Sequence, residues 1–453
     1  MMRTIHWTGG AMLSLLICGA VFAGGGYGEQ STLQEAMSDE AEIALPAIAK
    51  LREEGPAALD RVIAERDHYR NHLRDTPNEP DAAGLTRIME KLNQIIDQVG
   101  GQRYCSTSGL YWYTDLDKAK QAATEQNKPI LALRMLGKLT EELSCANSRF
   151  FRTTLYANEE ISQYLRDHYI LHWETVREVP KLTIDYGDGR VVERTITGNS
   201  AHYILAADGR PIDALPGLYD PQSFLQWAED GVQLHSELAS LTGRDWERHL
   251  TRYHQSSHAR LVSKWHDELN AVDPARWEPL TASAAVYSMH WGEQRALDLE
   301  RKMTDQDWQA LAARHAVGRN LDDRSRQLIR SENPTALQAS RLAMTKSVVE
   351  DPVLRMIRQL EGNIARDTVQ NEFRLRRQIH LWFADENQWD AVTGQVTNLN
   401  QQVYEKLFLM PLSDPWLGLV ASDQYSGLVN AGTTPSLPVI RVRNYFPQGG
   451  TSK

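Results

Sequence analysis

The stretch that decides the fold is Ser144-Cys145-Ala146-Asn147-Ser148-Arg149-Phe150-Phe151. Before it, Asn127-Lys128-Pro129 predicts a turn, and the apolar run Ile130-Leu131-Ala132-Leu133 predicts a buried strand. After it, apolar residues recur at helical spacing, namely Phe150, Phe151, Leu155, Ile161 and Leu165. A cysteine at the start of that helix meets unpaired backbone N–H groups and the positive end of the helix dipole, which stabilise the thiolate. The sequence therefore predicts a strand, a short loop and a helix-capping cysteine.

The flanking segments continue this pattern in a fixed order. Trp112 to Ala119 fits a first helix and its approach, and His168 to Glu174 fits a second central strand. His202 to Arg210 then fits a strand and a turn, and Phe224 to Trp227 fits a closing helix. This order, over residues 101–232, resembles the thioredoxin-like fold family, and specifically its exported bacterial members. The resemblance implies an α/β domain with a central mixed sheet flanked by helices.

Two positions depart from the family pattern. The Cys-x-x-Cys motif is here Cys145-Ala146-Asn147-Ser148, so a serine stands at the resolving position. Ser200 stands where the family has a cis-proline, which presents backbone to an extended substrate beside the cysteine. A serine hydroxyl cannot attack a mixed disulfide, and serine has no comparable preference for a cis bond. The sequence therefore argues against an ordinary dithiol cycle.

Three roles stay open for Cys145. The alternatives are a monothiol nucleophile like that of Cys-x-x-Ser glutaredoxins, one half of a structural disulfide, and a remnant in a fold reused for binding. Arg149 and Arg152 add positive charge near the sulfur if they point toward it. Against these roles stands ordinary packing, because cysteine is small and often buried.

The chain contains three cysteines, Cys18, Cys105 and Cys145. Residues 1–23 resemble a secretory signal with Arg3 in its basic region and Val21-Phe22-Ala23 as the cleavage site. We expect cleavage after Ala23 and a periplasmic or secreted protein. Lipid anchoring at Cys18 is disfavoured because Ile17 is larger than the usual residue before a lipidated cysteine.

Cleavage would leave Cys105 and Cys145 in an oxidising compartment. A bridge between them is possible, and Cys105 would then act as a distant resolving thiol or as a staple. Spacing alone does not give the Cα separation that a disulfide requires.

Composition bounds the partners. The formal net charge is −10, which argues against a nucleic-acid or anionic-membrane partner. No apolar run beyond the signal is long enough to span a membrane, so we expect no membrane insertion after cleavage. The sequence indicates no cofactor and leaves a protein partner or a thiol substrate of unknown identity.

The chain divides by pattern into five parts. After the signal, 24–100 reads as a helical segment with a boundary at Gly55-Pro56. Residues 101–232 form the thioredoxin-like domain, in which 181–196 is an inserted hairpin that extends the sheet edge or overhangs Cys145. Residues 233–431 read as a large all-α region, with Trp416 as an anchor, and 432–453 as an extended or loose tail.

Two further clusters have both a structural and a functional interpretation. His254 and His258 lie four residues apart and could share a metal, but no third ligand accompanies them, so we expect none. Asp367 and Asn371 interrupt the apolar stripe of the helix that begins at Pro352. They either bond a neighbouring helix end or an arginine, or they line a polar pocket.

The sequence leads to two functional hypotheses. The first is an exported monothiol redox or thiol-binding module, hence a thiol-disulfide oxidoreductase-like activity, that uses Cys145. The second is a non-catalytic protein-binding scaffold that has lost this activity. A reactive, accessible Cys145 favours the first, and a buried or bridged one favours the second.

Overall fold

A computed structural model describes residues 27–195, 198–277, 289–332, 352–414 and 417. The signal-like segment 1–23, the tail 432–453 and Trp416 lie outside the described residues. Within the described residues, no helix is both long and apolar enough to cross a membrane.

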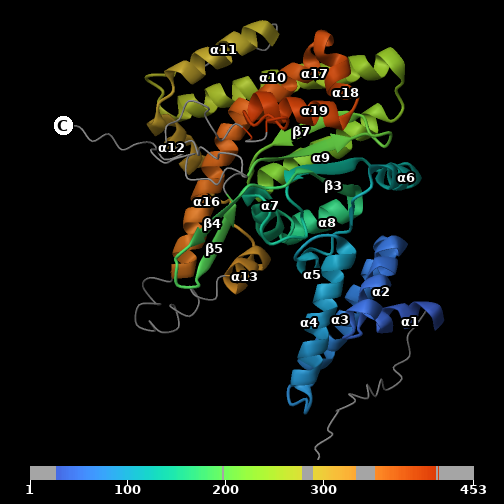
Figure 1. Ribbon diagram of the computed structural model, residues 1–453. Helices are drawn as coiled ribbons and strands as arrows, with labels where there is room; N and C mark the ends of the chain where they lie inside the picture. The colour runs from blue at the N-terminus through green and yellow to red at the C-terminus, as the bar shows by residue number, and fades with distance from the viewer. Residues whose placement is uncertain (1–26, 196–197, 278–288, 333–351, 415–416, 418–453) are drawn as a thin grey trace, which may run out of the picture.

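The centre of the molecule is a five-stranded mixed sheet in the order β1-β3-β2-β6-β7 (Figure 1). Its strands are β1 (Trp112–Tyr113), β2 (Ile130–Leu136), β3 (Ile170–Arg177), β6 (Ser200–Leu205) and β7 (Pro211–Pro216). The first three are parallel to one another, whereas β6 is antiparallel to both β2 and β7. Every residue of β2, β6 and β7 is buried, which matches their largely apolar sequences. The mixed sheet flanked by helices is therefore confirmed.

The helices of this region begin where the sequence places them. Asp115 caps α6 (Leu116–Gln126), and Asn127 ends it in the left-handed conformation before β2. Cys145 precedes α7 (Ala146–Phe150), which continues as the short π-helix η1 (Phe151–Leu155). Then come α8 (Glu159–His168) and, after β7, the closing helix α9 (Pro221–Leu238).

In the described part of the chain, five helices precede the sheet (Figure 1), and they have their own core. They are α1 (Tyr27–Ala36), α2 (Ala41–Glu54), α3 (Pro56–Asp75), α4 (Ala82–Gly100) and the short α5 (Cys105–Ser108). The predicted boundary at Gly55-Pro56 is correct, with Pro56 in the first turn of α3. Arg52 joins this segment to the sheet, because it donates to the carbonyl of Val99 in α4 at 2.8 Å and to that of Trp112 in β1 at 2.9 Å.

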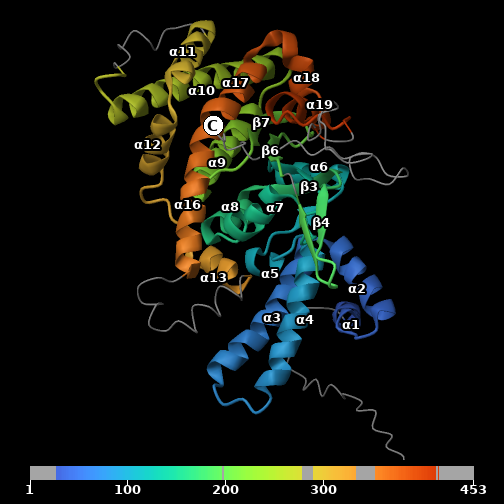
Figure 2. The ribbon, with the colours of Figure 1, turned by 60° about the vertical axis from the view of Figure 1, so that its left-hand side comes forward.

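The predicted hairpin forms, but it does not extend the main sheet. Strands β4 (Lys181–Asp185) and β5 (Val191–Thr195) make a separate two-stranded sheet. They pack chiefly on each other and form a narrow ribbon beside the sheet (Figures 1 and 2). The expectation of an extended sheet edge was wrong, because neither strand bonds to β1 or β7, the two edge strands.

The C-terminal part is helical, as expected. Its longer helices are α10 (Gly243–Val272), α11 (Met289–Lys302), α12 (Asp305–His315), α13 (Asp323–Ser331), α16 (Pro352–Asn371) and α17 (Arg377–Ala384). Two shorter helices follow, α18 (Trp389–Thr393) and α19 (Val396–Gln402), and α19 continues into the short π-helix η5 (Val403–Leu407). A short π-helix, η3 (Glu372–Arg376), joins α16 to α17.

The sheet and the C-terminal helices share one hydrophobic core. Residues on α17 and η5, such as Phe383 and Val403, belong to the same buried cluster as Ile130 and Tyr203 of the sheet. The expected boundary after residue 232 falls inside α9. The helical region is therefore packed onto the sheet over a continuous apolar interface.

Candidate functional site

Cys145 lies where the sequence places it, at the start of α7. It is the N-cap of that helix, and its Sγ accepts the N–H of Ser148 at 3.4 Å. The cysteine follows the loop from β2, and its N–H donates to the Leu136 carbonyl at the end of that strand. Strand, loop and helix therefore fix the sulfur at one end of the central sheet.

Ser200 is brought against this sulfur from β6. Its Oγ lies 3.1 Å from Cys145 Sγ, a hydrogen-bond distance in which either atom donates. Ser200 pairs with Met135 across β2 and β6, which brings the first residue of β6 close to the loop that carries Cys145. The two positions separated by 55 residues therefore form one centre.

The Ser148 hydroxyl bonds to groups other than the sulfur. Its Oγ lies 2.6 Å from Ser144 Oγ and 2.9 Å from the Cys145 carbonyl oxygen. The hydroxyl at the resolving position is thus engaged by its own helix turn and by a second serine. We call Ser144, Cys145, Ser148 and Ser200 the thiol centre; all four are fully buried.

A buried guanidinium supports the thiol centre. Arg152 Nη2 donates to Ser144 Oγ at 3.1 Å, and Nη1 donates to the Leu139 carbonyl at 3.1 Å. Burial lowers the pKa of Arg152 to about 10. The other arginine singled out in the sequence, Arg149, points to Thr195 Oγ1 of β5 at 3.1 Å instead. One of the two arginines therefore lies beside the centre.

The C-terminal helices close over the thiol centre. Tyr404 of η5 donates its hydroxyl to the Asn199 carbonyl at 2.8 Å, one residue before Ser200. Tyr203 of β6 donates to Asn400 Oδ1 of α19 at 3.0 Å. Burial raises the pKa of the Tyr404 phenol, and the neighbouring Cys145 adds to that effect. Cys145 has 0% of its surface exposed.

Cys105 lies elsewhere. It belongs to the core of the N-terminal helices, whereas Cys145 belongs to the sheet core. Both cysteines are free, and Cys105 Sγ donates to the Leu110 carbonyl at 3.3 Å. Burial, with Asp97 nearby, raises the pKa of the Cys105 thiol. The structure therefore does not join Cys105 to Cys145 and gives it no place as a resolving thiol.

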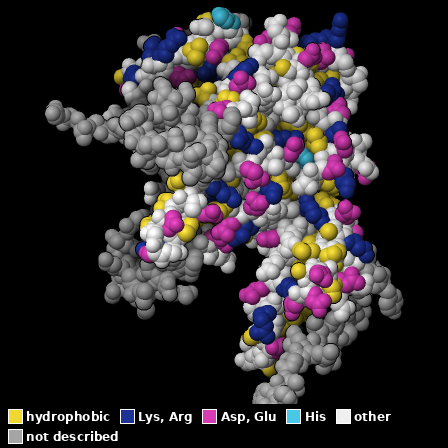
Figure 3. Space-filling model, in the orientation of Figure 1, with side chains coloured by type: hydrophobic (Ala, Val, Ile, Leu, Met, Phe, Trp, Pro, Cys, Tyr) yellow, Lys and Arg dark blue, Asp and Glu magenta, His cyan; other side chains and the backbone are white. Residues whose placement is uncertain are grey.

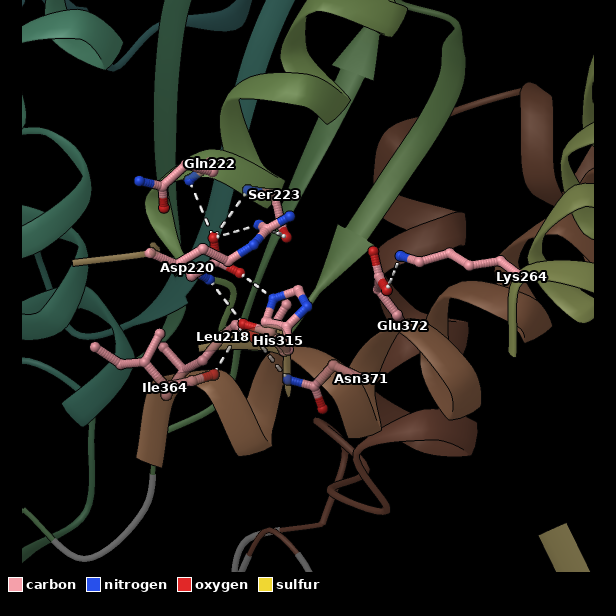
Figure 4. Close-up of polar contacts among 11 residues, drawn as sticks. Leu218, Asp220, Gln222, Ser223, Lys264, His315, Ile364, Asn371 and Glu372 are labelled. Atoms are coloured by element: carbon pink, nitrogen blue, oxygen red, sulfur yellow. Dashed lines mark hydrogen bonds and ion pairs between the residues drawn. The ribbon is translucent and has the colours of Figure 1, made fainter. Parts of the chain in front are cut away.

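Sequence reasoning missed a polar cluster around Asp220, the N-cap of α9 (Figure 4). Its carboxylate accepts the N–H groups of Gln222 and Ser223 at 3.1 Å each, as well as His315 Nε2 at 2.7 Å and Arg319 Nη1 at 2.9 Å. Burial opposes the charge, but the bonds and charges of His315 and Arg319 outweigh it and hold the Asp220 pKa well below its usual range.

The polar residues of α16 complete this cluster. Thr368 Oγ1 accepts the Asp220 N–H at 2.8 Å, and Asn371 Nδ2 donates to the Leu218 carbonyl at 2.9 Å (Figure 4). Asp367 is half-buried, and burial raises its pKa. Of the two interpretations of this helix, the bond to a neighbouring helix end describes Thr368, which binds the N-cap of α9, whereas Asn371 binds the loop two residues before that cap. The Asp220 cluster therefore fastens α12 and α16 to the start of α9.

A second charged cluster joins β7 to the helices, and we call it the sheet–helix joint. Arg376 of η3 forms a bidentate, buried ion pair with Asp213 of β7, and Trp227 Nε1 also donates to Asp213 at 3.1 Å. His254 of α10 lies between the Ile212 carbonyl and His380 of α17, 2.9 Å from each. Burial lowers the pKa of His254 to about 4.

The other histidine of the predicted pair, His258, lies 3.3 Å from Glu293 rather than sharing a ligand with His254. Among the described residues, no three His, Cys, Asp or Glu side chains are placed to hold a metal.

On the surface drawn in Figure 3, acidic and basic side chains are interspersed.

Comparisons with protein family models, with curated proteins and with solved structures gave no match for this chain. The inference of function therefore depends on the geometry of the thiol centre and its surroundings.

Proposed function

We propose that this protein is a non-catalytic protein-binding scaffold built on a thioredoxin-like sheet, in which Cys145 is a structural thiol. The sheet order, the antiparallel β6 and β7, and the cysteine that caps α7 support the thioredoxin-like assignment of residues 101–232. The loss of the Cys-x-x-Cys motif supports the loss of activity.

The observation that carries the proposal is the closure of the thiol centre. In thioredoxin-like proteins the backbone beside the position of Ser200 faces an extended substrate. Here the Asn199 carbonyl already accepts the Tyr404 hydroxyl, and Cys145 is fully buried. The chain's own C-terminal helices thus occupy the surface that a thiol substrate would need.

The chemistry of thiol–disulfide exchange also supports a non-catalytic role for Cys145. A thiolate that attacks a disulfide forms a mixed disulfide and releases one thiolate, and a second thiol must then attack to close the cycle. Ser148 has no thiol, and Cys105 lies in a different core. The described residues therefore supply no group that would complete the cycle.

A monothiol redox module is the second candidate, and one observation favours it. The Ser148 N–H donates to Cys145 Sγ at the start of α7, and Arg152 lies behind the neighbouring Ser144. A cysteine at the start of a helix that follows a buried strand is the position that a monothiol nucleophile of the thioredoxin-like family would occupy. This candidate requires η5 and α19 to move away from β6.

Glutathione disulfide distinguishes the two candidates. We expect the native, reduced protein to gain no glutathione on Cys145 over hours, and the same protein in urea to gain it readily, as read by peptide mass. The Cys145→Ser variant controls for labelling of Cys105. Rapid, stable glutathionylation of Cys145 in the native protein would overturn the scaffold proposal and establish the monothiol candidate.

A further inference from the structure

The β4–β5 hairpin exposes apolar side chains that a two-stranded ribbon cannot bury. Leu182, Ile184 and Tyr186 are 44%, 40% and 57% exposed. Leu182 and Ile184 of β4 and Tyr186 just after it occupy alternate positions and therefore lie on one face of the ribbon. An isolated two-stranded hairpin is marginally stable in water, and such exposed apolar faces mark interaction surfaces.

Among the residues that the structure describes, no strand pairs with the outer edge of β4. Strand β4 pairs with β5 alone, in the register Lys181 opposite Thr195 and Asp185 opposite Val191. Next to the turn, the Tyr186 N–H donates to the Arg190 carbonyl at 3.1 Å. In an antiparallel pair, the residues that bond across the ladder alternate with those whose N–H and C=O point outward. The backbone groups of Lys181, Thr183 and Asp185 therefore point to the open edge.

We propose that a second copy of this chain pairs with this edge, β4 against β4 in antiparallel orientation and centred on Thr183. In that register, Lys181 lies opposite Asp185 of the second copy, and by the two-fold symmetry Asp185 lies opposite Lys181 of the second copy. On the other face, Leu182 lies opposite Ile184. The result is a four-stranded sheet that satisfies the outward backbone groups and joins the two apolar faces.

The charges select β4 over β5. Within the hairpin, Lys181 and Asp185 face Thr195 and Val191, so neither has an opposite charge directly across the ladder. Asp185 Oδ1 accepts the Gly187 N–H at 2.8 Å, and its other oxygen is available to a lysine. The same symmetric pairing of β5 would place Glu193 opposite Glu193, and like charges directly opposed destabilise a sheet.

This inference deepens the proposed function by naming a partner, and it rests on the binding role proposed there. Its test is independent of Cys145. A chain that fails to dimerise leaves the glutathione result unchanged, and a reactive Cys145 leaves the dimer unchanged.

The first experiment swaps the charges in the full chain and measures mass by sedimentation velocity. We expect the native protein to sediment with twice the mass of one chain at micromolar concentration. In the symmetric dimer, Lys181→Asp sets an aspartate opposite Asp185 of the other copy at both places where the pair occurs. This like-charge contact should weaken dimerisation at least ~10-fold. Adding Asp185→Lys restores the opposite charges and should restore most of the dimer. A monomer at every concentration, or a dimer that Lys181→Asp leaves unaffected, would overturn the proposal.

The second experiment blocks or cross-links the edges with matched variants. Thr183→Pro removes an outward N–H of β4 and should give monomers, whereas Glu193→Pro on the β5 edge should leave the dimer intact. Thr183→Cys should form a disulfide-linked dimer under mild oxidation, and Glu193→Cys should not. Far-ultraviolet circular dichroism checks that each variant is folded. Equal effects at the two edges, or binding of a different chain's strand by an otherwise monomeric protein, would contradict the self-pairing.

Discussion

The thiol centre and the sheet–helix joint are both buried, but they differ in how they use polar groups. The thiol centre consists of a sulfur and serine hydroxyls, closed by the Tyr404 phenol. The joint consists of a carboxylate paired with a guanidinium, together with two histidines. The four residues of the thiol centre therefore form no ion pair, whereas a buried ion pair lies where the C-terminal helices attach.

This difference suggests a dependence between the two regions. Arg376 precedes α17, and the chain continues from α17 through α18 and α19 to Tyr404. The ion pair on β7 thus holds the helices whose last turn covers Cys145. We infer that the joint keeps the thiol centre closed.

Breaking the ion pair should have the largest effect. Asp213→Asn leaves the Arg376 charge buried without its carboxylate, and removing one partner of a buried pair costs about 3–5 kcal/mol. We expect a loss of that size in the free energy of unfolding in urea, together with faster alkylation of Cys145. The control is Asp208→Asn, which removes the exposed pair with Arg210 and should cost under about 1 kcal/mol. Equal losses in the two variants would contradict the importance of the joint.

Acidification should weaken the joint next. Burial lowers the pKa of His254 to about 4, whereas unfolding returns it to about 6.5. Between these values the unfolded chain binds a proton that the folded chain does not, so stability falls as pH falls, by about 1.4 kcal/mol per pH unit. The His254→Gln variant should show a slope smaller by that amount between pH 6 and 4. Replacing the half-buried His249 by Gln is the control, and an unchanged slope in His254→Gln would be evidence against a buried neutral histidine.

A backbone position near the Asp220 cluster should show a smaller effect. Gly217 has a φ of +96°, and a Cβ there would lie 2.6 Å from Asn371 Nδ2. Gly217→Ala should therefore cost about 1–3 kcal/mol, from backbone strain and from displacement of Asn371. Gly187→Ala provides the comparison, since its φ is also positive but no atom lies within 4 Å of its Cβ. If both variants lose the same stability, the contact with Asn371 contributes nothing.

The smallest effect should come from the thiol centre itself. Ser200→Ala removes the hydroxyl 3.1 Å from Cys145 Sγ and should cost about 1 kcal/mol in urea unfolding. Cys145 should stay slow to alkylate in this variant, because Tyr404 and the helices above it remain. A large gain in alkylation rate would mean that Ser200, rather than the helices, protects the sulfur.

The local parts of this arrangement were predictable from the sequence. The turn at Asn127-Lys128-Pro129, the boundary at Gly55-Pro56 and the cysteine that caps α7 each follow from residues within one or two turns of each other. The approach of Ser200 to Cys145 was predictable from the resemblance to a known order of elements. These features depend on short-range backbone chemistry or on a familiar topology.

The long-range parts were not predictable. The polar interruption of α16 was visible as a pattern, but its partners at Leu218 and Asp220 lie about 150 residues away. Tyr404 and Asp213 show no local signal, since an apolar stripe gives the buried face of a helix without naming what it covers. The closure of the thiol centre, which decides between the functional hypotheses, therefore required the structure.

The central claim is that the C-terminal helices seal Cys145, and its alkylation in the native protein tests it directly. We predict that iodoacetamide modifies Cys145 in the reduced, folded chain at least ~100-fold more slowly than in urea, because labelling requires local opening of α19 and η5. Tyr404→Ala should recover part of that rate while the chain stays folded. Modification of Cys145 in the native protein at the rate seen in urea would contradict the account and restore Cys145 as a working thiol.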